Sequence, residues 1–214
     1  MLHKWSNVPI DHLKIYVEDC VNVADYIVSV GCGNGKYEYE ISKSNQNLRN
    51  KFILVDPNPE SFEEYPSDGK YLKINYNHTS DLIKDKPDVI SNCVLLLIWP
   101  YSSYTDDSNY DYEAIELLKP NSIICLYEVP RNMDIGSSGS TKLINFFDKI
   151  NDYKEISTTR YGYKGQMGNI YPKIKWIAKK NSKVPKLKKC LKLQEEVCKL
   201  SEVDLSNETA CVIS

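Results

Sequence analysis

Short runs of apolar residues that alternate with helical stretches constrain the fold more than any other feature of this sequence. The runs cover residues 26–30, 51–55, 71–74, 88–98 and 122–129. They are nearly solid with β-branched and other apolar side chains, as strands buried on both faces are. Alternation of such strands with helices is typical of a mostly parallel sheet covered by helices on both faces. We therefore expect an α/β fold.

The segments around these runs complete the expected order of elements. Helical spacing is found at about 9–20, 35–48, 78–84, 111–118 and 141–150. Two further strands are expected at 153–159 and 171–180, joined by a glycine-containing stretch that favours an antiparallel closure. Beyond residue 180 the sequence is first rich in lysine and then acidic and polar. We place the boundary there, with a domain at 1–180 and, at 181–214, a lysine-rich tail helix followed by a polar extension.

Composition limits the classes of protein to which the chain can belong. Its 214 residues are 42% hydrophobic and 26% charged, which fits one globular domain with a packed core. A formal net charge of −2 argues against a surface built to neutralise nucleic-acid phosphates, although it leaves a nucleic-acid substrate open. Seven cysteines without a CxxC pair, and no apolar stretch of spanning length, predict a cytoplasmic protein.

A glycine-rich segment separates the first strand from the next helix: Gly31-Cys32-Gly33-Asn34-Gly35. Alternate glycines let the backbone turn tightly and approach a ligand closely, because no Cβ stands in the way. A phosphate-binding P-loop needs a different spacing of glycines and lysine, so that reading is excluded. A dinucleotide fingerprint needs a third glycine where Lys36 stands, which leaves a nicotinamide oxidoreductase as the weaker alternative.

An acidic residue follows the second strand at the distance expected of a ribose ligand. Asp56, with Pro57 after it, lies at the carboxyl end of the run 51–55. A carboxylate about 20 residues past such glycines can accept hydrogen bonds from both ribose hydroxyls. Together with the glycine segment it predicts a site for an adenosine-containing ligand.

These motifs resemble those of the class I S-adenosylmethionine-dependent methyltransferases. The resemblance rests on the GxGxG segment, on residues 87–92, which are similar to the family's fourth strand, and on the Leu-Lys-Pro turn at 118–120, and it covers about 9–180. It implies a Rossmann-like, seven-stranded sheet with helices on both faces and its last strand antiparallel. It also implies S-adenosylmethionine as cofactor and methyl transfer to an acceptor that the sequence does not identify.

The resemblance assigns cofactor contacts residue by residue. They are Ser29, Gly31, Cys32, Gly33, Gly35, Asp56, Pro57, Asn75 and Asn92. Ser29 departs from the family, which usually has an acidic residue there to hold the methionine amino group. Asn75, chosen over Asn77, would accept a hydrogen bond from the adenine amine. The missing acid at Ser29 keeps a second interpretation open, a catalytically inactive binding module at a membrane surface.

An aromatic stretch after the fourth strand is the expected wall of the acceptor pocket. It contains Trp99, Tyr101 and Tyr104. The Asn-Pro-Pro-Tyr motif of some amino-group methyltransferases is absent, and no catalytic side chain is identified. Since the histidines have no metal-ligand spacing, we expect no metal.

The last four residues, Cys211-Val212-Ile213-Ser214, match the pattern that directs farnesyl attachment to the cysteine in eukaryotic cells. One prenyl chain anchors weakly, so a second signal is expected. The lysine-rich run 179–192 would meet anionic lipid, and Cys190 or Cys198 would carry an acyl chain. The tail therefore predicts a protein held on the cytosolic face of a membrane.

Overall fold

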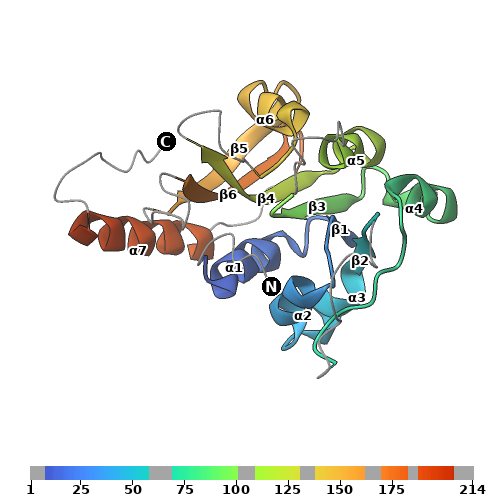
Figure 1. Ribbon diagram of the computed structural model, residues 1–214, viewed down its shortest axis with the longest axis horizontal. Coiled ribbons are helices and arrows are strands. Elements are labelled where there is room, and N and C mark those ends of the chain that lie inside the picture. The colour runs from blue at the N-terminus through green and yellow to red at the C-terminus, as the bar shows by residue number, and fades with distance from the viewer. Residues whose placement is uncertain are drawn as a thin grey trace.

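A single mixed sheet forms the centre of the computed structural model, with helices covering both of its faces (Figure 1). The structure describes residues 8–57, 69–100, 109–130, 138–161, 170–182 and 188–204. The strands are β1 (Tyr26–Val30), β2 (Phe52–Val55), β3 (Cys93–Ile98), β4 (Ser122–Pro130), β5 (Tyr153–Arg160) and β6 (Ile170–Lys179). Their order across the sheet is β2-β1-β3-β4-β6-β5.

Two apolar cores, one on each face of the sheet, hold the layers together. The helices are α1 (Ile10–Cys20), α2 (Lys36–Ser42), α3 (Gln46–Lys51), α4 (Thr79–Asp85), α5 (Tyr110–Leu118), α6 (Thr141–Asp148) and α7 (Lys188–Asp204), with a 3-10 turn, η2, at Pro87–Val89. Buried residues of α1, α2, α3 and α7 form one core with the sheet, and those of α4, α5 and α6 form the other. This confirms the expected α/β class.

The sheet has six strands in the described part of the chain, and not the seven that were expected. The strands β1 to β4 are parallel, and β6 is antiparallel to both β4 and β5. The strand expected at 71–74 does not form, and only an isolated bridge between Val55 and Tyr76 remains of it. The reason is local: the Asn75 side-chain oxygen accepts the Leu54 N–H at 2.8 Å and takes the bond that a strand backbone would make.

Two other boundaries differ from the expectation. The fourth apolar run begins as strand at Cys93 and not at residue 88, because Pro87 opens a 3-10 turn that buries Val89 instead. The single helix expected over 35–48 is two helices. Asn45 ends the first by capping the second, since its side chain accepts the Leu48 N–H.

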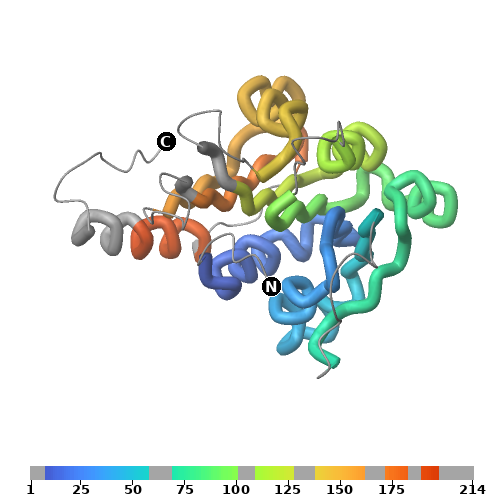
Figure 2. Tube along the Cα trace, viewed as in Figure 1, coloured from blue at the N-terminus to red at the C-terminus, as the bar shows by residue number. Residues whose placement is uncertain are grey.

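The segment after residue 180 adds a helix to the domain. This helix, α7, lies beside α1 (Figure 2) and buries Cys190, Leu193 and Val197. The Cys190 thiol has no exposed surface and lies 3.2 Å from an Asp19 carboxylate oxygen, so the predicted acyl attachment at Cys190 does not fit this placement. No helix of the described ranges is long and apolar enough to cross a membrane.

Candidate functional site

The glycine segment and Asp56 meet at one edge of the sheet. Both follow the carboxyl ends of neighbouring parallel strands, β1 and β2. Parallel strands end at a common edge, and ligands of open α/β sheets bind outside that edge. The chain also leaves β1 and β3 in opposite directions across the sheet, which places a topological switch point beside the glycine segment.

The backbone of the glycine segment has a conformation that side-chain-bearing residues rarely adopt. Gly31, Gly33 and Gly35 have φ angles of 70, 59 and 68°. The Gly33 N–H donates to the Asp56 carboxylate at 2.7 Å, and the Gly31 N–H donates to the Val55 carbonyl at 2.9 Å. The structure therefore brings the predicted loop and the predicted carboxylate into direct contact.

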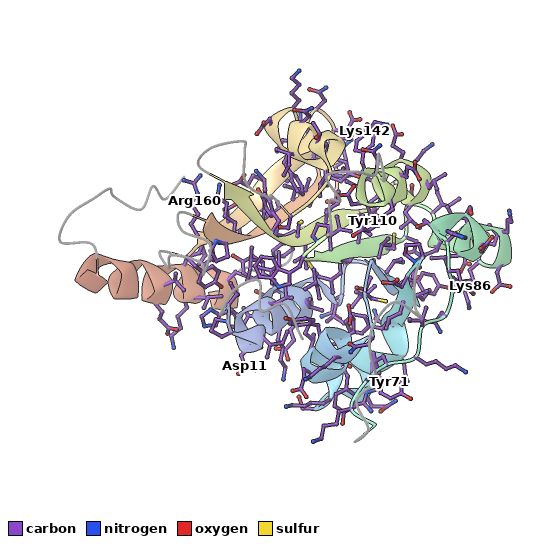
Figure 3. The ribbon with its side chains drawn as sticks, viewed as in Figure 1. Asp11, Tyr71, Lys86, Tyr110, Lys142 and Arg160 are labelled. Carbon is purple, nitrogen blue, oxygen red and sulfur yellow. The ribbon has the colours of Figure 1, made fainter. Side chains whose placement is uncertain are left out.

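Two of the glycines also make room for other parts of the chain. A Cβ on Gly35 would lie 2.2 Å from the Leu72 carbonyl oxygen, and the Leu72 N–H donates to the Gly35 carbonyl. A Cβ on Gly31 would lie 2.7 Å from the ring of Tyr110, at the start of α5 (Figure 3). The Leu72 backbone thus requires glycine at position 35, whereas a side chain at position 31 would have to displace the Tyr110 ring.

Ser29 pairs with a carboxylate that the sequence analysis did not single out. Its hydroxyl donates to Glu38 Oε1 at 2.6 Å, and both side chains are fully buried. Burial raises the pKa of Glu38 to about 7, against the hydrogen bond from Ser29, which lowers it, and the nearby Asp56 charge raises it further. The first turn of α2 therefore places a buried carboxylate against Ser29.

Cys32 lies inside the glycine loop with its thiol buried. Burial raises the pKa of this thiol, and the neighbouring charges of Glu38 and Asp56 add to the effect. A thiol with a raised pKa stays protonated near neutral pH and is a poor nucleophile. The side chain of Cys32 therefore packs with the apolar core on this face of the sheet.

Trp99 follows β3 at the same edge of the sheet. Its backbone has a φ angle of 51°, and its N–H donates to the Leu126 carbonyl at 2.9 Å. Its side chain lowers the pKa of the Tyr37 hydroxyl by hydrogen bonding, although burial has the larger effect and raises it. Trp99 thus lies beside the first turn of α2. Tyr101 and Tyr104 lie outside the described residues.

Of three further predicted contacts, one lies far from Asp56. Asn92 precedes β3 and exchanges hydrogen bonds with Asp25 at the amino edge of the sheet, so its assignment to the cofactor is corrected. Its position was misjudged because the strand was expected to begin at residue 88. The side-chain oxygen of Asn75 accepts the Leu54 N–H, and Pro57 is the last described residue before the gap that follows β2.

Glu38 is the functional candidate that sequence reasoning missed. The segment Lys36–Ser42 alternates tyrosine and glutamate, which suggests a solvated helix. Its buried side chains are Glu38, Ile41 and Ser42. Because residues three and four apart share a face of a helix, this spacing was the signal that points Glu38 inward. No group of His, Cys, Asp and Glu side chains in the described ranges could hold a metal ion.

Comparison with known proteins establishes the fold. No family model and no curated protein matches the sequence. A protein of Listeria monocytogenes, a candidate class I S-adenosylmethionine-dependent methyltransferase, is 14% identical over 97% of this chain and 73% of its own, with a TM-score of 0.52. The O-methyltransferase TomG of Streptomyces achromogenes, solved with S-adenosylmethionine, is 12% identical over 83% of each chain, with a TM-score of 0.49. A methyltransferase of Methanosarcina mazei scores 0.47 at 14% identity, over 77% of this chain and 96% of its own.

Proposed function

We propose that this protein binds S-adenosylmethionine at the glycine loop and transfers its methyl group to an acceptor. The observation that carries the proposal is the bond from the Gly33 N–H to the Asp56 carboxylate at 2.7 Å. It turns the carboxylate at the end of β2 toward the loop at the end of β1. The fold shared with the Listeria monocytogenes protein is consistent with this use of the site.

The residues present fit the cofactor. The backbone of Gly31, Gly33 and Gly35 would border it, and Asp56 would accept hydrogen bonds from its ribose hydroxyls. When bound, the cofactor supplies a methyl group that is already electrophilic. The chain therefore needs to orient the acceptor and exclude water, and a dedicated catalytic side chain is not required. Trp99, and with it Tyr101 and Tyr104, is the proposed wall on the acceptor side.

Calorimetric titration of the purified chain with S-adenosylmethionine tests the proposal. We expect saturable binding by the natural sequence and an affinity at least about a hundredfold lower in Asp56→Ala. The variant removes both the carboxylate that would bind the ribose and the acceptor of the Gly33 N–H. Asp81→Ala, on α4, is the matched control and should bind normally. Equal heats for the natural chain and Asp56→Ala would contradict the proposal, provided that circular dichroism shows both to be folded.

A binding module without activity is the second candidate. It was favoured by Ser29, which stands where an acid is usual. The buried Glu38 bonded to Ser29 supplies a carboxylate at this place and so weakens that argument. Release of S-adenosylhomocysteine on incubation with pools of small molecules, proteins and RNA separates an enzyme from a module that only binds.

Attachment to the cytosolic face of a membrane is a further proposal from the sequence. The proposal rests on Cys211 and Cys198, which would carry lipid chains, and on the lysines of 179–192, which would contact anionic lipid. The residues 205–214 and the side chain of Cys198 lie outside the described part of the chain. The intact mass of the protein from eukaryotic cells checks it, since one farnesyl group and removal of the last three residues are expected.

A further inference from the structure

One oxygen of the Glu38 carboxylate has no hydrogen-bond donor. The side chain is fully buried; Oε1 accepts from Ser29, and Oε2 has no partner in the described part of the chain. No ion pair joins Glu38 to a lysine, arginine or histidine of the described residues. A buried carboxylate in this condition is costly when ionised, because burial removes its hydration and little replaces it.

Among the described residues around Glu38, no titratable group is a cation, and Asp56 adds a negative charge. The titratable groups that act on it or feel its charge are the Asp56 carboxylate from β2, the Cys32 thiol from the loop and the Tyr37 hydroxyl from α2. All three are acids, and none is a cation. The pair Ser29–Glu38 lies at the end of β1 and the start of α2, on the two sides of the glycine loop. The charge that would balance this cluster is therefore a positive one beside the loop.

We propose that Glu38 makes the site selective for a positively charged ligand, so that S-adenosylmethionine binds more tightly than the neutral product S-adenosylhomocysteine. This inference rests on the proposed function. The sulfonium carries the charge that methyl transfer removes, so the ionised form of Glu38 behind the loop favours the methyl donor over the product. Because Glu38 is fully buried, it acts through its field and through the bond to Ser29, as a positioning residue.

The proposed role predicts that the protein releases protons when it binds the positively charged ligand. With its pKa raised to about 7 by burial, Glu38 is partly protonated in the free protein near neutral pH. A cation bound beside the loop favours the ionised form and expels up to about one proton per site. A neutral ligand has no such effect. Binding of S-adenosylmethionine should therefore tighten by about tenfold between pH 6 and pH 8, whereas binding of S-adenosylhomocysteine should change little.

Calorimetry of the full chain with both ligands, in phosphate and in Tris buffer, tests the inference through the protons released. Glu38→Gln should bind S-adenosylmethionine about tenfold more weakly than the natural chain at pH 8, bind S-adenosylhomocysteine equally well, and release fewer protons. The amino group of the ligand titrates alike in both proteins, so the difference between them belongs to Glu38. Glu38→Asp keeps the charge and should keep the selectivity.

Glu40→Gln is the matched control. Glu40 lies on the same helix but pairs with Lys43 at 2.6 Å, so its replacement should change neither the affinity nor the protons released. The inference is overturned if Glu38→Gln keeps the selectivity and pH profile of the natural chain. If Glu38→Gln does not fold, the natural chain alone decides: release of the same number of protons with both ligands overturns the inference. If the natural chain binds neither ligand, the proposed function fails with it.

Discussion

Two buried carboxylates, one on each face of the sheet, are held in opposite ways. Asp111 on α5 and Glu38 on α2 are both fully inaccessible to solvent. Asp111 accepts from the Ser140 N–H at 2.7 Å, from the Ser140 hydroxyl at 2.6 Å and from the Tyr112 N–H at 2.7 Å. Glu38 accepts from one side-chain donor, Ser29, and its second oxygen has no partner in the described residues.

The difference separates a carboxylate that holds the structure together from one that is available for function. Ser140 is the N-cap of α6, so Asp111 ties the start of α5 to the start of α6. Burial raises the pKa of Asp111, and the hydrogen bonds from Ser140 and Tyr112 lower it. Its donors compensate for lost hydration, as buried polar groups require. Glu38 lacks such compensation and lies beside the candidate site.

The largest effect that tests this comparison is expected for Asp111→Ala. The substitution leaves the buried N–H and hydroxyl of Ser140 without an acceptor, and we expect a loss of about 4 kcal/mol in the free energy of unfolding. Urea denaturation measures it. Glu116→Gln, an exposed change on the same helix, should cost less than about 0.5 kcal/mol. A cost below about 1 kcal/mol for Asp111→Ala would remove the distinction between the two carboxylates.

The pH dependence of stability tests the other member of the pair. The pKa of Glu38 is about 7 in the folded chain against an ordinary value of 4.5, so the folded state binds this proton more tightly. Its contribution to stability is present below about pH 4.5 and is lost as the pH rises through 7, by up to about 3 kcal/mol. Glu38→Gln should flatten this decline in denaturation curves measured at pH 5 and pH 8. An unchanged slope would show that Glu38 titrates normally.

The smallest expected effect is a difference between two glycines with the same backbone conformation. Gly35 and Gly69 both have a φ angle of 68°, but only at Gly35 would a Cβ meet the Leu72 carbonyl, 2.2 Å away. Alanine at Gly69 should cost about 1 kcal/mol through strain alone, and at Gly35 about 2 kcal/mol more through the clash. Thermal unfolding of the two variants measures the difference. Equal costs would mean that the helix carrying Glu38 can shift freely.

Much of the fold and part of the candidate site could be predicted from local patterns. Solid apolar runs predicted the buried strands, and the position of Asp56 after the second strand predicted its meeting with the glycine loop. The prediction of a strand at 71–74 was wrong because the Asn75 side chain accepts the Leu54 N–H bond that a strand backbone would accept. Asn92 was assigned to the wrong edge because Pro87 delays the start of β3. In both cases one side chain decided what periodicity alone could not.

The sequence by itself determined the class of fold and the contact between the glycine loop and Asp56, because parallel strands that follow one another must end at the same edge of the sheet. Only the tertiary structure decided that Glu38 is buried against Ser29, and that α7 joins the core through Cys190, Leu193 and Val197. Burial is a property of the neighbours that cover a side chain, and those neighbours come from distant parts of the chain. The role that we propose for Glu38 in cofactor selection therefore follows only from the packing of α2 against β1.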